Sequence, residues 1–263
     1  MIKVQNLSFQ YRKDLPLLLN DLSFEIDQGT VLTILGKNGV GKTTFLRCLT
    51  GELSSYGGSI YIDQKEVRDY SISELSQKIA LVASNSPCYQ NLSVADFLVT
   101  GFANRLASLQ SPNKKHYLQA LDILDSLGQA SLFNRHTSEL SSGEMQIVKI
   151  ARAILQEPSV IVFDEPTSNL DVKNQLLILE QISSLALRGF TVITTTHNPG
   201  QTLELGGTAL LLTGDRQIYG PADIVLTESN LREVYDLNVV IEDGHFRKYA
   251  AFSNDEDRHH LVY

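Results

Sequence analysis

One glycine-rich segment has the residue types and spacing to hold phosphate groups. Residues 36–43 read G-K-N-G-V-G-K-T and fit the pattern G-x-x-x-x-G-K-[ST] between an apolar run and a helix-forming run. Glycines let backbone N–H groups face phosphate oxygens, and a helix start adds a favourable dipole. We expect Lys42 to neutralise the β- and γ-phosphates of a nucleotide and Thr43 to ligate Mg²⁺. The alternative is a glycine-rich turn without a ligand.

A second candidate is a pair of carboxylates that follows an apolar run. Residues 160–163 read V-I-V-F, and Asp164 and Glu165 come next. A buried strand ending in two carboxylates is costly unless a cation or water meets them there. Beside a phosphate-binding turn, we expect Asp164 to hold Mg²⁺ through water and Glu165 to polarise the attacking water. The alternative is two solvated carboxylates at a strand end.

A third pattern places serine and glycine at the start of an expected helix. Residues 140–144 read L-S-S-G-E and precede the helix-forming run 145–155. Ser141 and Gly143 suit the N-cap and first turn of that helix. Helix capping and phosphate binding use the same geometry, so the residues alone leave both roles open.

In their order along the chain, these segments resemble the nucleotide-binding subunit of an ATP-binding cassette (ABC) transporter. L-S-S-G-E is similar to the signature of that family, usually L-S-G-G-Q, and the resemblance covers at least residues 1–225. In the family, the signature contacts the γ-phosphate bound to a second subunit. The resemblance therefore implies a head-to-tail dimer of two copies with two ATP molecules between them.

Three further positions match the family. Residues 168–171, S-N-L-D, look like the D-loop that crosses the dimer interface. His197 follows the run 191–196 and matches the switch histidine at the γ-phosphate, whereas a structural histidine is the alternative. Tyr11 lies where the family places an aromatic residue that stacks on adenine, and ordinary strand packing is its alternative.

The resemblance implies ATP and Mg²⁺ as cofactors and assigns a role to each matching residue. The expected catalytic residues are Glu165, His197 and Lys42, and the expected metal ligands are Thr43 and Asp164. The expected nucleotide-binding residues are Tyr11, Gly36, Asn38, Gly39, Gly41, Lys42, Thr43, Thr44, Ser141 and Gly143.

One departure from the family concerns the expected Mg²⁺ site. The family usually has a glutamine at the end of the strand that reads K-I-A-L-V-A here, where it reaches Mg²⁺ and links the site to the helical subdomain. The corresponding residue is Ser84, which is too short for that reach, and Asn85 or Gln90 is a possible substitute. This substitution makes tight coupling between ATP and a partner uncertain.

Apolar patterning predicts the elements that must position these residues. We expect strands over 2–9, 22–26, 31–35, 59–63, 79–83, 159–163, 191–196 and 208–213, and helices from about 42, near 72–78, over 143–155 and over 173–187. This alternation predicts an α/β P-loop NTPase with a mostly parallel sheet and an N-terminal antiparallel β subdomain. A helical subdomain is expected as an insertion at about 85–140. The expected division is an ABC ATPase domain over 1–225 and a C-terminal extension over 226–263, with a helix at 228–235 and a strand at 238–242.

Composition narrows the class of protein. Among 263 residues, 30 are acidic and 22 basic, so the net charge of −8 argues against a nucleic-acid partner. Two cysteines, Cys48 and Cys88, are too few for a disulfide framework or a zinc site. No apolar run approaches the about 20 residues that span a bilayer, and the N-terminus lacks a signal peptide. We expect a chain at the cytoplasmic face of the cell membrane, bound there through a partner.

The last part of the chain suggests which transporter is served. Residues 220–241 resemble the end of ATPases that serve iron-siderophore, haem and vitamin B12 importers. We therefore expect the ATP-hydrolysing subunit of an importer for an iron chelate, with separate integral membrane permease subunits and, indirectly, an extracytoplasmic solute-binding protein. Residues 85–102 are expected to dock the permease, or else to form the core of the helical subdomain.

Other functions stay open at this stage. An importer motor for another solute such as vitamin B12 and a soluble ABC ATPase of cluster assembly are the main alternatives. A DNA-repair type of ABC ATPase disagrees with the acidic charge and with the short spacing between Lys42 and Leu140. A non-hydrolysing subunit disagrees with the intact Lys42, Asp164, Glu165 and His197.

Overall fold

The computed structural model describes residues 1–83, 92–106, 110–214, 216–236, 238–243 and 248–253. Ser84, Asn85, Cys88 and Gln90 lie outside the described residues. The strands are β1 (Ile2–Phe9), β2 (Leu19–Ile26), β3 (Val31–Leu35), β4 (Gly57–Ile62), β5 (Lys65–Glu66), β6 (Ile79–Ala83), β7 (Val160–Asp164), β8 (Thr191–Thr196), β9 (Thr208–Leu212), β10 (Gln217–Pro221), β11 (Asn238–Asp243) and β12 (Lys248–Ser253).

The helices lie between these strands. They are α1 (Lys42–Leu49), α2 (Ile72–Lys78), α3 (Val94–Val99), α4 (Lys114–Ser126), α5 (Ser142–Leu155), α6 (Val172–Leu187), α7 (Pro199–Leu205), α8 (Ala222–Val225) and α9 (Glu228–Tyr235). Short 3-10 turns cover Val67–Asp69, Thr100–Phe102, Ala130–Leu132 and Thr137–Glu139.

Strand pairing builds two main sheets in the described part of the chain. The larger sheet has the order β10-β9-β3-β8-β7-β6, in which the strands from β9 to β6 run parallel and β10 runs antiparallel. The smaller sheet, β2-β1-β4-β5, is antiparallel. The expected mostly parallel sheet and N-terminal antiparallel subdomain are therefore confirmed. The antiparallel edge strand β10 was not predicted, because its short sequence Q-I-Y-G-P ends in glycine and proline and lacks the alternation of a strand.

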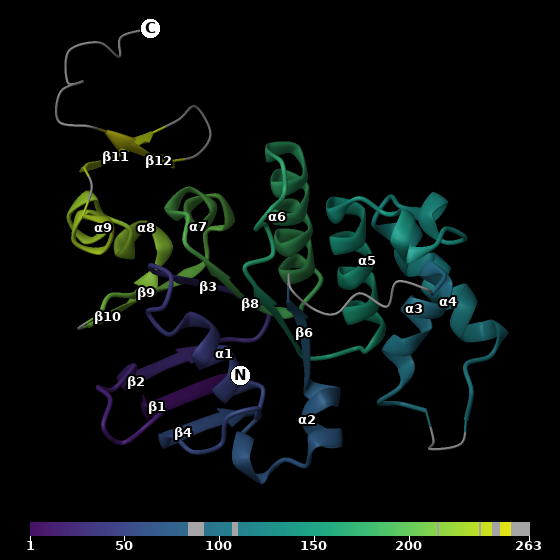
Figure 1. Ribbon diagram of the computed structural model, residues 1–263, viewed down its shortest axis with the longest axis horizontal. Helices are drawn as coiled ribbons and strands as arrows, with labels where there is room; N and C mark the ends of the chain where they lie inside the picture. The colour runs from purple at the N-terminus through teal and green to yellow at the C-terminus, as the bar shows by residue number, and fades with distance from the viewer. Residues whose placement is uncertain (84–91, 107–109, 215, 237, 244–247, 254–263) are drawn as a thin grey trace, which may run out of the picture.

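Side chains of the inner strand β7 pack alternately on the two faces of the larger sheet. Val160 and Val162 belong to the apolar cluster built by the smaller sheet and α1, and Ile161 and Phe163 belong to the cluster built by α3–α6. Because successive strand residues point to opposite faces, an unbroken apolar strand needs cover on both sides. Figure 1 shows α5 and α6 above the larger sheet and α1 with the smaller sheet below it.

The segment between β6 and α5 contains the helices α3 and α4, which confirms the inserted helical subdomain. Val94, Phe97, Leu98 and Phe102 are almost completely buried in the cluster that includes α5. In the described part of residues 85–102, these apolar side chains therefore form the core of the helical subdomain, which was the alternative to a docking role.

The C-terminal helices pack on the end of the larger sheet. Leu231 and Val234 of α9 are buried in one apolar cluster with Leu35 of β3 and Leu211 of β9. Leu35 directly precedes the glycine-rich turn, so α9 supports the strand that carries it. The division of the chain at residue 225 stays a prediction. Within the described residues, no helix has the length and apolar character of a membrane span.

Candidate active site

The glycine-rich segment forms the turn between β3 and α1. Gly39 and Gly41 have φ angles of +83° and +113°, which glycine adopts without steric cost. A Cβ atom at Gly41 would lie 2.9 Å from Leu19 Cδ2, so this position requires glycine on two counts. Among the described residues, no side chain caps the N-terminus of α1. Its first-turn N–H groups are therefore suited to an anion.

A cavity of about 430 Å³ opens beside this turn. It lies at the carboxyl ends of parallel strands, where open α/β sheets bind ligands. Its lining consists of Tyr11, Leu18, Asn38, Gly39, Gly41, Lys42, Thr43, Thr44, Asp164 and Glu165. Most of the expected nucleotide-binding residues are thus brought together, whereas Gly36, His197, Ser141 and Gly143 are not part of this lining.

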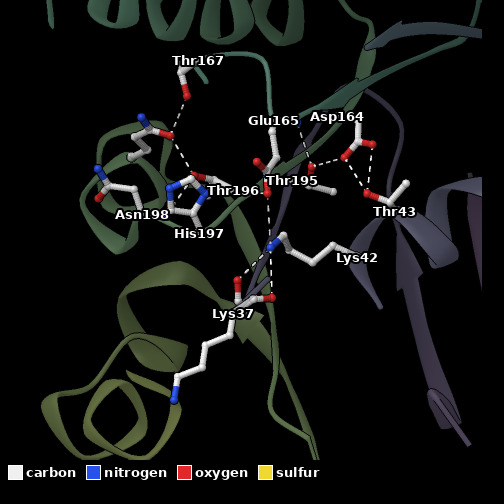
Figure 2. Close-up of polar contacts among 12 residues, drawn as sticks. Lys37, Lys42, Thr43, Asp164, Glu165, Thr167, Thr195, Thr196, His197 and Asn198 are labelled. Carbon is white, nitrogen blue, oxygen red and sulfur yellow. Dashed lines mark hydrogen bonds and ion pairs between the residues drawn. The ribbon is translucent and has the colours of Figure 1, made fainter. Parts of the chain in front are cut away.

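Lys42 is the buried cation of the cavity, with 5% of its side chain exposed. Its Nζ donates to the backbone oxygens of Gly36 at 2.8 Å and of Lys37 at 3.2 Å, and it lies 3.4 Å from Oε1 of Glu165. A buried ammonium group is costly without such partners. In Figure 2 the side chain of Lys37 extends away from this group, so Lys42 alone of these two lysines faces the carboxylate.

Thr43 and Asp164 join the glycine-rich turn to β7. The Thr43 hydroxyl lies 3.0 Å from Oδ2 and 3.2 Å from Oδ1 of Asp164. The Thr195 hydroxyl of the neighbouring strand β8 donates to Oδ1 of Asp164 at 2.7 Å. Two hydroxyl groups therefore orient this carboxylate (Figure 2).

These oxygens fit the chemistry of Mg²⁺, which prefers hydroxyl and carboxylate ligands. In the described ranges, no three His, Cys, Asp or Glu side chains converge on one metal position. Mg²⁺ is usually bound by one or two carboxylates together with substrate phosphates. Thr43 and Asp164 thus suit a metal ion that arrives with a nucleotide.

Glu165 sits in a strained position between two nitrogen groups. Its φ angle is +47°, in the left-handed region that a residue with a Cβ rarely adopts. Its N–H donates to the Thr195 hydroxyl at 2.9 Å, and its Oε1 lies 3.7 Å from Nδ1 of His197. Such strain persists where the surrounding structure enforces it, and it is common at functional sites.

His197 directly follows β8, and its side chain remains 54% exposed. The residues on either side of it are held by buried polar groups. Thr196 donates through its hydroxyl to Oε1 of Gln201 at 2.7 Å, and the Asn198 N–H donates to that hydroxyl at 3.1 Å. Thr167 donates to the same Gln201 oxygen at 3.0 Å, which links this turn to the segment after Glu165 (Figure 2).

Tyr11 presents a half-exposed ring at the edge of the cavity, with 52% of the residue exposed. Its hydroxyl lies 3.0 Å from the Thr44 hydroxyl, and its ring meets Phe9 edge to face at 4.9 Å between centroids. The contact with Phe9 is the strand packing that was the alternative interpretation. The Tyr11 ring is nevertheless half exposed, so stacking on adenine and strand packing are both compatible with its geometry.

Ser141 and Gly143 begin α5, away from the lining of this cavity. The Ser141 hydroxyl accepts the Glu144 N–H at 3.2 Å, and the Ser141 N–H donates to the Glu144 carboxylate at 2.8 Å. These bonds from Ser141, with Arg135 nearby, hold the pKa of Glu144 below its ordinary value. Gly143 is needed for packing, because its Cβ would lie 2.5 Å from Cγ of Asn174.

The segment resembling a D-loop leads directly into α6. Asp171 is the N-cap of this helix and accepts the Asn174 N–H at 2.8 Å. Asn169 has a φ angle of +61°. Because Asn174 bonds Asp171 and also lies against Gly143, it connects the start of α6 to the start of α5.

Sequence reasoning missed Thr195 and Gln201, which orient Asp164 and the residues around His197. A signal was present, because residues 194–196 place three threonines at the end of a strand that is buried throughout. Buried hydroxyl groups need partners. The partners belong to β7 and α7, whose proximity is set only by the fold.

Comparisons with known proteins agree on one family. The family model described as ABC transporter matches residues 19–168. A Helicobacter pylori protein assigned to iron chelatin transport as an ATP-binding protein is 32% identical over 95% of this chain and 99% of its own length. A molybdate import ATP-binding protein of Haemophilus influenzae is 31% identical over 94% of this chain and 92% of its own.

A solved structure extends this similarity to three dimensions. It is an inward-facing conformation of a transporter assigned to the metal-chelate type of ABC transporter. The similarity has a TM-score of 0.85 and 29% identity, and it covers 97% of this chain and 98% of that chain.

Proposed function

Because the chain belongs to the ABC transporter family of ATP-binding proteins, we propose that it is the motor subunit of an importer for an iron chelate. As a member of that family it is an ATPase that binds ATP. The observation that carries its catalytic role is the convergence of Lys42, Glu165 and His197 at the mouth of the glycine-rich turn. The transported solute and the partners belong to the proposal.

Different residues at the cavity bind ATP, hold the metal ion and act in hydrolysis. Lys42 and the N–H groups of the glycine-rich turn bind the β- and γ-phosphates, since a buried cation and an uncapped helix start both attract anions. Tyr11 stacks on adenine. Thr43 and Asp164 hold Mg²⁺, which neutralises phosphate charge when bound. Glu165 orients the attacking water and accepts its proton, while His197 stabilises charge on the γ-phosphate.

A second copy completes each site in this proposal. Ser141 and Gly143 are absent from the cavity lining of their own chain, and helix starts bind phosphate well. A head-to-tail dimer brings the start of α5 of one copy to the γ-phosphate held by the other. ATP closes the dimer, and loss of the γ-phosphate lets it reopen.

The remaining partners follow from the importer assignment. The helical subdomain transmits closure to integral membrane permease subunits, and the chain sits at the cytoplasmic face of the membrane. A solute-binding protein outside the membrane delivers the solute. The iron chelate is favoured by the Helicobacter pylori relative and by the metal-chelate type of the similar structure. Molybdate is the second candidate, favoured by the Haemophilus influenzae relative.

The hydrolytic role is tested with Glu165→Gln. We expect ATP hydrolysis by the full chain to fall at least about 100-fold, because the group that accepts the proton is lost. ATP binding persists, so the variant forms an ATP-dependent dimer in size-exclusion chromatography. Glu180→Gln removes one exposed carboxylate of α6 and serves as the control, with unchanged hydrolysis. Undiminished hydrolysis in Glu165→Gln would refute the role of this residue.

The solute is tested by uptake in a deletion strain of the source organism. Cells receive labelled ferric siderophore, haem or molybdate, and carry the wild-type chain, Glu165→Gln or no copy. We expect iron-chelate uptake with the wild type alone. Molybdate uptake alone would move the assignment to the second candidate. Equal uptake of all three solutes with and without the chain would argue for a role outside these transport systems.

A further inference from the structure

The imidazole of His197 is placed mainly by its backbone. Its ring is more than half exposed, and its contact with Glu165 spans 3.7 Å from Nδ1 to Oε1. The backbone before and after it is fixed through the Thr196 hydroxyl, which bonds Gln201 and the Asn198 N–H. Any further bond to the His197 backbone therefore acts on the position of the ring.

Such a bond comes from the C-terminal part of the chain. The Tyr235 hydroxyl, on the last residue of α9, donates to the backbone oxygen of His197 at 2.7 Å. Burial raises the pKa of this phenol above its ordinary value, so the hydroxyl keeps its proton in alkaline solution as well as at neutral pH. The bond joins segments that lie on opposite sides of β9 and β10 in sequence.

Helix α9 holds Tyr235 firmly in place. Thr227 caps the helix by accepting the Asn230 N–H at 3.1 Å, and the Asn230 side chain donates to the Val225 oxygen at 2.8 Å. Leu231 of this helix is fully buried in one apolar cluster with Leu35, the last residue of the strand that leads into the glycine-rich turn. The helix that carries the Tyr235 phenol therefore packs in one cluster with β3, the strand that leads to Lys42.

We propose that Tyr235 is a positioning residue that sets the place of His197 relative to Glu165 by holding its backbone oxygen. This inference rests on the proposed role of His197 in ATP hydrolysis. It makes α9, which lies beyond the residues matched by the family model, a working part of the ATPase site. Tyr235 itself lies outside the lining of the ATP cavity.

The kinetic test is Tyr235→Phe in the full chain, which removes the hydroxyl and keeps the ring. We expect kcat for ATP to fall about fivefold, since one neutral hydrogen bond is lost. KM and the Kd for ATP stay unchanged, because Tyr235 does not reach the nucleotide. Tyr70→Phe is the matched control, since the Tyr70 hydroxyl also donates to a backbone oxygen, that of Ile62, at 2.7 Å.

An NMR experiment tests the position of the His197 ring without measuring ATP hydrolysis. The chain has 6 histidines, so histidine-labelled protein gives few imidazole signals in an NMR spectrum. The His197 signal is identified by its loss in His197→Gln. We expect this signal to shift in Tyr235→Phe and to stay in place in Tyr70→Phe.

The outcomes separate this inference from the proposed function. If His197→Gln hydrolyses ATP at the wild-type rate, both the role of His197 and the inference fail. If His197→Gln is impaired while Tyr235→Phe keeps its kcat and its His197 signal, only the inference is overturned. An equal loss of kcat in Tyr235→Phe and Tyr70→Phe would reduce Tyr235 to a merely structural residue.

Discussion

Two helix starts in this molecule contain glycine and a hydroxyl residue but are capped differently. At α1, the N-cap is Gly41 and, in the described chain, no side chain caps the helix, so its N–H groups face the cavity. At α5, Ser141 and Glu144 satisfy each other in a capping box. The N–H groups of the first start are left for a ligand or water. The second is capped by side chains of its own chain.

The α5 start has an internal counterpart that carries no proposed function. Ser71 and Glu74 form a capping box at α2 with the same two distances, 3.2 and 2.8 Å, as Ser141 and Glu144. Capping alone therefore cannot distinguish a structural helix start from a functional one. Variants at the two serines separate these roles.

The largest effect is expected at the α1 start. Lys42→Ala removes the buried cation, and we expect the Kd for ATP to rise about 100-fold, because a charge-assisted bond to phosphate is lost. Isothermal titration calorimetry measures the change. Lys37→Ala carries the same charge change at the neighbouring exposed lysine and should bind ATP as the wild type does. Equal binding by both variants would contradict the role of Lys42.

An intermediate effect is expected at the α5 start. Ser141→Ala should lower ATP hydrolysis about tenfold, because one bond to the opposing γ-phosphate is lost. ATP binding by the single chain stays unchanged. Ser71→Ala is the control, since both variants should lose about 1 kcal/mol of unfolding free energy from the missing cap. If both serine variants hydrolyse ATP equally well, Ser141 is a helix cap and nothing more.

The smallest effect concerns the charge within the α5 capping box. The folded-state pKa of Glu144 lies below its ordinary value of 4.5. Its stabilisation is therefore present above pH 4.5 and is lost as the pH falls through the folded-state pKa.

Glu144→Gln keeps one acceptor oxygen for the Ser141 N–H, and it removes the charge together with the second oxygen that accepts from Arg135. We expect the wild type to exceed the variant by about 0.5 kcal/mol of unfolding free energy at pH 7, since the site is partly exposed. The difference should shrink as the pH falls below 4.5. Urea denaturation at several pH values measures it, and a difference that grows in acid would reverse the assigned sign.

Local patterns were sufficient for much of the fold. The apolar runs that became β3, β7 and β8 and the helix-forming runs that became α1, α5 and α6 were predicted to within a few residues. The short helix α7 was not predicted, because it holds only P-G-Q-T-L-E-L and lacks an apolar stripe. The edge strand β10 and the short helix α8 were missed for the same reason.

The candidate site shows the same division. The motif residues Lys42, Thr43, Asp164 and Glu165 were identified from sequence, and they line one cavity. These residues can be identified from sequence because binding phosphate and metal requires particular residue types between a strand and a helix. The roles proposed for Ser141 and Gly143 depend on a second copy and stay predictions.

By itself, the sequence determined the family, the order of the main strands and helices apart from α7, β10 and α8, and the residues able to meet phosphate and Mg²⁺. Only the tertiary structure decided that Thr195 orients Asp164, that Gln201 joins Thr167 to Thr196, and that Tyr235 holds His197. The physical reason is that sequence patterns report on neighbours along one strand or helix. A hydrogen bond between distant segments depends on packing that brings them within about 3 Å, and no local pattern encodes that distance.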